Sequence, residues 1–370
     1  MTRPVSLKWL PPLVLLSLFA CLPALGGEPA PNPRVNRGPE YSLPPDELTP
    51  VKVYTAAEVP QDVVPWWAAQ TGITECWNKG ADGKGVTIAV LDTGIDTTHP
   101  ALKGSIVGAF DLTGSMSGPS DVNGHGTHCA GIVHVLAPEA KLLGVKVLGD
   151  QGSGYDDTIG KGIDLAVSKG AHVLSLSLGS PQPGQFSKAA IDRALAAGVV
   201  VICAAGNEGP ANNTIGYPGA YPGVICVAAV DAQDTVAGFS SRGPRLDVSS
   251  YGVSIRSTYP GGRYATMSGT SMACPNVAGA VACLLSQRKR TPAEMVKALQ
   301  ETAKDLSIPG RDTATGFGLI QPAKLLGDPA VPQPMPRGFV LGWDDLTEAA
   351  RGRLKGQGVD SLKLEVTLKP

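Results

Sequence analysis

The sequence carries almost no net charge, because 31 lysine and arginine residues offset 32 aspartate and glutamate residues and leave a formal charge of -1. Such a balance creates no field that would attract nucleic acid or an anionic membrane surface, so neither is expected as a partner. None of the seven cysteines lies in a CxxC pair, which removes the ligand spacing of a structural zinc site. No internal repeat is present either. What remains, with 43% hydrophobic residues, 46 glycines and 32 prolines, is typical of a globular, loop-rich chain.

The N-terminus has the pattern of an export signal. Two basic residues precede an apolar run over residues 9–22, and small residues follow it. Prolines inside the run disfavour a lasting membrane helix. We therefore expect residues 1–27 to be a signal peptide and the protein to be secreted or held in the cell envelope. Two kinds of processing stay open: ordinary cleavage near Gly26, or acylation of Cys21, which would leave a lipid anchor.

Two further segments separate the chain into parts. Residues 28–61 are rich in proline and polar residues and are interpreted as a linker or a short pro-segment. Residues 328–337 are proline-rich again and predict a second linker. The tail that follows, residues 338–370, has no role that its sequence indicates. Within it we expect a helix over 343–354 and a strand over 361–368.

The central part, residues 62–327, alternates between two kinds of pattern. Short runs of apolar and β-branched residues predict buried strands at 86–91, 141–148, 173–178, 199–205 and 224–230. Helical patterns are found at 125–136, 158–168, 187–197, 271–287 and 292–302. Strands that alternate with helices predict an α/β fold, in which a parallel sheet is covered on both faces.

Three residues at the expected junctions suit nucleophilic catalysis, which needs a hydroxyl, an imidazole that takes its proton and a carboxylate that orients the imidazole. Asp92 ends a predicted strand, and His125 lies between two glycines at an expected helix start. Ser271 precedes a strongly apolar helix. Taken singly, each also fits a structural role, for example a solvated turn residue or a helix N-cap.

The segments that hold these residues resemble the three signature blocks of the subtilase family. They are residues 89–96, 123–131 and 268–273, and they follow one another in the family's chain order of Asp, His and Ser. The resemblance runs from about Asp62 to Gly327. It implies a subtilisin-like three-layer sandwich around a mostly parallel sheet. It also implies a serine endopeptidase that works through an acyl-enzyme and requires no cofactor.

The resemblance extends to residues that would bind the substrate. Asn207, in residues 204–209, corresponds to the family's side-chain donor to the oxyanion. Two segments would flank an extended substrate, and small residues would line a wide first pocket with Glu208 at its rim, which favours large apolar residues next to the cut bond. The flanking residues are Gly152, Gly154, Ser177, Leu178 and Gly179, and the pocket residues are Ala204, Ala205 and Gly216. Asp156 and Asp157 would attract basic residues at a more distant subsite.

The sequence also supports expectations about metal sites and disulfides. Ala101 stands where relatives place an acidic ligand, so the tight calcium site of those relatives is not expected. The resemblance leaves a weak calcium or sodium site at Gly219, Tyr221, Val224 and Asp247. Most cysteines are interpreted as buried thiols. If a disulfide forms, Cys203 and Cys226 on neighbouring strands are the best pair.

Two other functions fit the same chain. One is a protease with narrow specificity that processes a single partner protein. The other is a catalytically silent, subtilase-like envelope or binding protein. The main interpretation is a monomeric endopeptidase that acts on proteins or peptides.

Overall fold

The structure, a computed structural model, describes residues 36–44, 50–59, 63–326, 339–342 and 363–366. The predicted signal peptide, Cys21 and the helix expected over 343–354 lie outside these residues. Among the residues described, no helix is both long and apolar enough to cross a membrane.

A seven-stranded sheet forms the centre of the fold, and all its neighbouring strands are parallel. The strand order is β10-β9-β8-β7-β3-β5-β4. Five of the seven strands lie where the sequence predicts them, because their apolar, β-branched residues suit a position buried on both faces. The bounds are β3 Thr87–Asp92, β4 Ile106–Asp111, β5 Lys141–Lys146, β7 Val173–Leu176, β8 Val200–Ala204, β9 Ile225–Val230 and β10 Val248–Tyr251.

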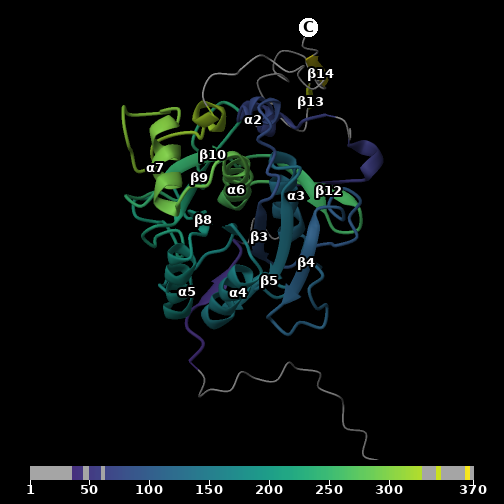
Figure 1. Ribbon diagram of the computed structural model, residues 1–370, viewed down its shortest axis with the longest axis vertical. Coiled ribbons are helices and arrows are strands. Elements are labelled where there is room, and N and C mark those ends of the chain that lie inside the picture. The colour runs from purple at the N-terminus through teal and green to yellow at the C-terminus, as the bar shows by residue number, and fades with distance from the viewer. Residues whose placement is uncertain (1–35, 45–49, 60–62, 327–338, 343–362, 367–370) are drawn as a thin grey trace, which may run out of the picture. The chain divides into compact units, whose positions relative to one another are not determined.

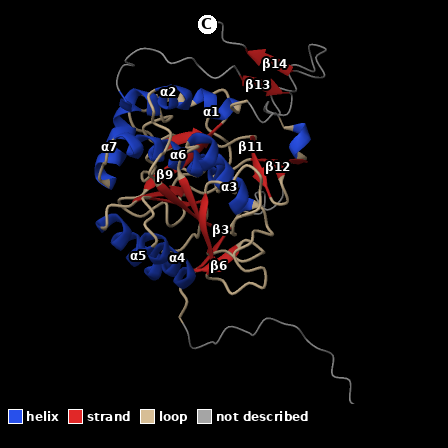
Figure 2. Cartoon of the chain, turned by 45° about the vertical axis from the view of Figure 1, so that its right-hand side comes forward, coloured by secondary structure: helices blue, strands red, loops and turns tan. Residues whose placement is uncertain are grey.

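Helices cover both faces of this sheet (Figures 1 and 2). In β3, Ile88 and Val90 pack into the core shared with α3 and α6, whereas Ala89 and Leu91 pack into the core shared with α4 and α5. This alternation is the period of a strand that faces two helical layers. The predicted three-layer α/β sandwich is therefore confirmed. The bounds are α3 His125–Leu136, α4 Asp156–Ser168, α5 Gln185–Ala196 and α6 Thr270–Gln287.

Smaller elements complete the fold, and the sequence predicted one of the described antiparallel strands but not the others. Strand β12 pairs with β11 on one side and β2 on the other, and β1 pairs with β6. In the tail, β13 pairs with β14, which falls inside the predicted strand. The bounds are β1 Glu40–Ser42, β2 Lys52–Tyr54, η2 Ala56–Glu58, α1 Trp66–Gln70, α2 Ile73–Asn78, β6 Ser153–Tyr155, β11 Ile255–Tyr259, β12 Arg263–Met267, α7 Pro292–Thr302, η3 Pro322–Leu326, β13 Phe339–Gly342 and β14 Lys363–Val366.

Strands β1 and β2 correct one expectation. Both belong to residues 28–61, which were interpreted as a linker or a short pro-segment. The interpretation of these two segments as a linker without regular structure is wrong, since each strand is hydrogen-bonded to a strand more than one hundred residues away in the chain. The pro-segment interpretation stays a prediction.

The order of strands also determines where a site forms. From β3 the chain continues to β4 and β5 on one side of the sheet, whereas from β7 it continues to β8 and β9 on the other. Side chains at the carboxyl ends of β3 and β7 therefore border a crevice, since connections leave this point in opposite directions. Asp92 is the last residue of β3, and Ser177 follows β7 directly.

Candidate active site

Asp92 and His125 form a buried hydrogen-bonded pair at the carboxyl end of β3. His125 Nδ1 lies 2.8 Å from Asp92 Oδ1, and neither side chain is exposed to solvent. An ionised carboxylate can only accept a hydrogen bond, so Nδ1 carries the hydrogen. In the neutral imidazole the lone pair is then on Nε2. The N–H of Thr93 donates a second bond to Asp92 Oδ1, at 2.7 Å, which further fixes the carboxylate.

Two effects act on the pKa of His125 in opposite directions. Burial disfavours the charged ring and lowers the pKa, whereas the negative charge of Asp92 and the hydrogen bond to it raise the pKa. The net result is a pKa well above the usual value of 6.5. Asp92 therefore makes the imidazole a stronger base and stabilises its protonated form.

Asp121, which the sequence analysis did not single out, fixes the start of α3. Its two carboxylate oxygens accept bonds from the N–H groups of Gly124 and Thr127, both at 2.8 Å. The hydroxyl of Thr93 donates to Asp121 Oδ1 at 2.9 Å. The carboxylate thus connects the loop after β3 to the first turn of the helix that begins with His125. An aspartate just before an expected helix start was the signal that could have identified it.

Ser271 is the second residue of α6, and its backbone lies next to the histidine. The Ser271 carbonyl accepts bonds from Ser177 Oγ at 2.9 Å and Cys129 Sγ at 3.5 Å. The same sulfur lies 3.8 Å from His125 Nδ1. Cys129 is therefore packed between the imidazole and the backbone of Ser271. The folding of α3 against α6 brings together residues from two of the three signature segments.

The side chain of Asn207 has a defined orientation. Its Oδ1 accepts bonds from the N–H of Thr270 at 3.0 Å and from the Thr270 hydroxyl at 2.9 Å. A backbone N–H can only donate, so the atom that faces Thr270 must be the oxygen. The amide nitrogen Nδ2 consequently points to the other side. Asn207 and Ser271 line one pocket.

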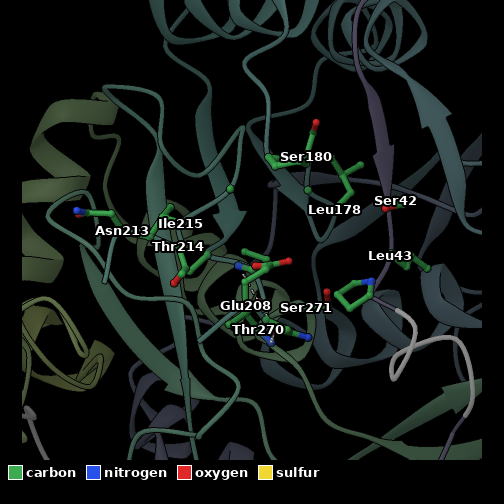
Figure 3. Close-up of a pocket in the computed structure, with 18 residues that line it drawn as sticks. Ser42, Leu43, Leu178, Ser180, Glu208, Asn213, Thr214, Ile215, Thr270 and Ser271 are labelled. Atoms are coloured by element: carbon green, nitrogen blue, oxygen red, sulfur yellow. Dashed lines mark hydrogen bonds between the residues drawn. The ribbon is translucent and has the colours of Figure 1, made fainter. Parts of the chain in front are cut away.

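A pocket of about 540 Å³ extends from Ser271. Ala204, Ala205 and Gly216, the three residues predicted for the first specificity pocket, all line it. Glu208 lies at the same pocket, and its carboxylate accepts a bond from Ser241 Oγ at 2.8 Å. Figure 3 shows further lining residues on the side opposite Ser42 and Leu43, with Ser271 between the two groups. These further residues are Asn213, Thr214 and Ile215.

The two segments predicted to flank an extended substrate do flank a strand, and this strand is the chain's own β1. Ser42 donates its N–H to the Gly179 carbonyl at 3.0 Å and accepts a bond from the Gly179 N–H at 3.4 Å. Leu43 donates its N–H to the Gly152 carbonyl at 3.0 Å. Tyr41 pairs with Gly154. The groove between the flanking segments is therefore occupied by residues from the N-terminal part of the same chain.

Comparisons with known proteins agree with this geometry. Residues 83–318 match the model of the family described as "Subtilase family". The chain belongs to the subtilase family. It is 41% identical to subtilisin E of Bacillus subtilis (strain 168) over 270 residues, which are 70% of each chain. It is 40% identical to subtilisin Savinase of Lederbergia lenta over 270 residues, 70% of this chain and 96% of that one. Among solved structures, Sphericase matches with a TM-score of 0.64 and 34% identity, over 71% of this chain and 99% of that one. This subtilase is accordingly a subtilisin-like serine endopeptidase, a hydrolase of peptide bonds.

The sequence predicted that Asp156 and Asp157 attract basic residues of the substrate at a distant subsite, and for Asp156 this prediction is wrong. This carboxylate is buried and accepts bonds from the N–H groups of Phe186 at 2.8 Å and Ser187 at 3.0 Å. Both N–H groups belong to the first turn of α5, so Asp156 caps that helix from a neighbouring one. Asp157 forms ion pairs with Lys161 at 2.9 Å and with Arg37 at 3.1 Å.

We expect Asp156→Ala to lower the free energy of unfolding by about 1 to 3 kcal/mol, because two N–H groups in the first turn of α5 lose their acceptor. Urea denaturation measures this change. The matched control is Asp164→Ala, which removes an exposed bond to Arg193 and should cost less than about 1 kcal/mol. Equal effects of the two substitutions would contradict the capping role.

At the weak cation site predicted from the sequence, two of the four residues already have other partners. Arg245 Nη2 donates to the Tyr221 carbonyl at 3.0 Å, so a guanidinium lies where the cation was expected. Asp247 accepts bonds from the N–H of Cys226 at 3.0 Å and from Gln300 Nε2 at 2.9 Å. The prediction concerned Gly219, Tyr221, Val224 and Asp247. The contacts of Tyr221 and Asp247 count against a bound calcium or sodium ion, and the site itself stays a prediction.

The cysteines in the described part of the chain are buried, as the sequence predicts. Cys203 and Cys226 face each other across β8 and β9, as predicted, yet they are not joined. All cysteines in the described part of the chain are buried free thiols. Burial raises the pKa of both thiols well above the usual value of 9.0, so neither is a reactive thiolate. The buried-thiol interpretation is confirmed.

Proposed function

We propose that Ser271 is the nucleophile of this endopeptidase and that His125 and Asp92 activate it. Ser271 attacks the carbonyl carbon of the peptide bond while His125 Nε2 accepts its proton. Asp92 holds the imidazole in the tautomer that has its lone pair on Nε2 and stabilises the charged ring that forms. The same ring then protonates the leaving amine, and water hydrolyses the acyl-enzyme. The observation that carries the proposal is the 2.8 Å bond between His125 and Asp92 beside the start of α6.

Two N–H donors would stabilise the oxyanion in this mechanism. Asn207 turns its Oδ1 to Thr270 and lines the same pocket as Ser271, which supports Nδ2 as one of the donors. The N–H of Ser271 belongs to the first turn of α6, where N–H groups and the positive end of the helix dipole suit an anion. No step of this mechanism requires a metal or a nucleotide.

The pocket supports a proposal on specificity. Its walls near Ser271 consist of small residues, which leaves room for a large apolar side chain next to the cut bond. We further propose that the protein is exported and cuts protein substrates as a monomer. The order of basic, apolar and small residues at the N-terminus supports export.

Labelling with a fluorophosphonate tests the nucleophile. Because β1 covers the groove, the reagent is applied to the natural chain and to a Tyr41→Ala chain, whose strand has lost a fully buried side chain. We expect one label per molecule, located on the peptide that contains Ser271. A catalytically silent binding protein would take up no label in either chain, and that result would end the proposal.

Asn207→Ala is expected to lower kcat about 100- to 1000-fold and to change KM little. This magnitude is the established one for removal of the corresponding asparagine in subtilisin. Kinetics with a short peptide p-nitroanilide in the Tyr41→Ala background measure the change. Asn212→Ala, an exposed asparagine of the neighbouring loop, is the control. A fall in kcat of less than tenfold would exclude Asn207 as an oxyanion donor.

A further inference from the structure

Strand β11 contacts the helix that begins with His125, and the two elements lie side by side in Figure 2. Two hydroxyls of the strand donate to backbone carbonyls of α3. Ser257 Oγ donates to the His128 carbonyl at 2.8 Å, and Thr258 Oγ1 donates to the Thr127 carbonyl at 2.7 Å. A carbonyl oxygen has two lone pairs, so it can accept such a bond in addition to the one within the helix. These bonds hold β11 against the first turns of α3.

The side chain of His128 forms a further bond between the helix and the same strand. Its Nε2 lies 3.1 Å from the Ile255 carbonyl and 3.0 Å from the Ala265 carbonyl, so this nitrogen carries the hydrogen. Burial lowers the pKa of His128 to about 3, so the ring is neutral near neutral pH. Ile255 belongs to β11 and Ala265 to β12. His128 therefore connects α3 to both strands of the β11–β12 hairpin.

The hairpin also leads to Ser271. Its two strands are antiparallel, and only Ser268 and Gly269 lie between the end of β12 and the start of α6, which holds Ser271. One strand of the hairpin is thus bonded to the helix of His125, and the other strand continues into the helix of Ser271. A movement of α3 relative to α6 would break these bonds or deform the hairpin. The hairpin therefore connects the two residues in addition to the direct packing of α3 on α6.

Tyr259, the last residue of β11, contacts the turn directly before His125. Its hydroxyl donates to the Asn123 carbonyl at 3.1 Å. The side-chain oxygen of Asn123 accepts a bond from the His125 N–H at 3.3 Å. Asn123 is thus bonded to Tyr259 through its backbone and to His125 through its side chain. Among the described residues, Tyr259 is not one of those that line the pocket at Ser271, which favours an effect through this turn.

Gly124 allows the ring of Tyr259 to lie against the same turn. Its φ is +107°, in the left-handed region that favours glycine. A Cβ at this position would also overlap with the ring carbons of Tyr259. The Arg263 guanidinium lies 5.3 Å from the centre of this ring and further limits its movement. The ring and the hydroxyl of Tyr259 therefore both restrain the turn from which α3 begins.

We propose that Tyr259 is a positioning residue for catalysis, which fixes the turn at Asn123 and Gly124 and thereby places the imidazole of His125 for proton transfer from Ser271. The inference rests on the proposed function of His125 and Ser271. Proton transfer needs a distance of about 2.6 to 3.2 Å between the two heavy atoms, and a misplacement of about 1 Å can cost on the order of 100-fold in rate. Loss of the restraint should therefore lower kcat, whereas KM depends on the pocket and the groove.

The first experiment removes the hydroxyl and then the whole ring, in the full chain with Tyr41→Ala. Tyr259→Phe should lower kcat about fivefold, because one hydrogen bond to the turn is lost. Tyr259→Ala should lower kcat on the order of 100-fold, because the turn loses both restraints. KM for a peptide p-nitroanilide should change less than about twofold in both variants. The control is Tyr264→Phe on β12, whose ring packs edge-on against His99, and it should leave kcat unchanged.

Labelling to completion with a fluorophosphonate separates positioning from a loss of folded protein. The label counts the folded active sites, and kcat is expressed per labelled site. If Tyr259 only stabilised the fold, its variants would have a lower melting temperature and fewer labelled sites, with the same kcat per site. That result would overturn the inference. A rise in KM with kcat unchanged would overturn it as well, since Tyr259 would then act on substrate binding.

The second experiment tests the contact between the ring and Gly124. In the chain with Tyr259, Gly124→Ala places a Cβ against the ring and should lower kcat per site on the order of 100-fold. In Tyr259→Ala the space of the ring is empty, so the same change should lower kcat about tenfold or less, the part that comes from backbone strain at Gly124. Equal factors in the two backgrounds would show that the ring and the turn are not coupled, which contradicts the inference.

The outcomes separate the two proposals. If the chain with Tyr41→Ala alone takes up no label and shows no turnover, the proposed function fails and the inference fails with it. If that chain is labelled and active, and both Tyr259 variants keep its kcat per site, only the positioning role of Tyr259 fails.

Discussion

Replacement of Ser271 by alanine is expected to lower kcat about 10⁶-fold, the magnitude already established for loss of the nucleophile in subtilisin. The change removes the hydroxyl oxygen that would attack the peptide carbonyl. It leaves the contacts of the Ser271 carbonyl with Ser177 and Cys129 in place, because these involve the backbone. The fold should therefore be unchanged while turnover disappears. Kinetics in the Tyr41→Ala background, together with thermal unfolding, measure both quantities.

The control for this prediction is Ser286→Ala on the same helix. Ser286 Oγ donates to the carbonyl of Cys283 near the end of α6, and Ser286 is not among the residues that line the pocket at Ser271. Its replacement should leave kcat and fluorophosphonate labelling as they are. If Ser271→Ala kept more than about one part in a thousand of the activity and still took up the label, another residue would be the nucleophile.

Local sequence patterns predicted the parallel part of the fold well. The apolar runs that became β3, β5, β7, β8 and β9 are buried on both faces, so periodicity and residue type point to the same structure. Strands β10, β11 and β12 were missed. They contain serine, threonine and arginine, and they form because tertiary partners stand beside them rather than because of their own composition.

The residues of the site likewise include some that the sequence could predict and some that it could not. Asp92 and His125 could be predicted because each is embedded in a motif whose glycines and strand end are visible in the sequence, and the structure brings the two together. Asp156 could not be placed, since its acceptor role depends on α5 packing beside α4. Strand β1 could not be placed either. A proline-rich segment without periodicity shows no preference for a strand until a groove supplies the partners on both sides.

Asp92→Asn is expected to lower kcat about 10⁴-fold near neutral pH. The amide keeps the shape of the side chain but can donate a hydrogen to Nδ1, which favours the tautomer with its hydrogen on Nε2. That tautomer cannot accept the proton of Ser271. The loss should be smaller than that of Ser271→Ala, because the nucleophile and the oxyanion donors remain. Kinetics in the Tyr41→Ala background, measured from acid to alkaline pH, test this.

The pH profile gives a second test of the same substitution. Only the neutral ring of His125 can accept a proton, so kcat/KM of the enzyme with Asp92 should rise with pH through the His125 pKa. Since Asp92 raises this pKa well above 6.5, the acid limb should lie above pH 6.5. In Asp92→Asn the charge that raises the pKa is gone, whereas the burial that lowers it remains, so the residual activity should extend to lower pH.

Asp96→Asn separates this effect from a general loss of negative charge near the site. The Asp96 carboxylate is bonded to Thr98 and to the N–H of Gly261, and these bonds do not involve His125. Its replacement should leave the acid limb where it is. A limb that moved equally in both variants, or that moved to higher pH in Asp92→Asn, would contradict the assignment of Asp92 as the group that sets the basicity of His125. The direction of the shift thus tests the geometry at Asp92 independently of how much activity is lost.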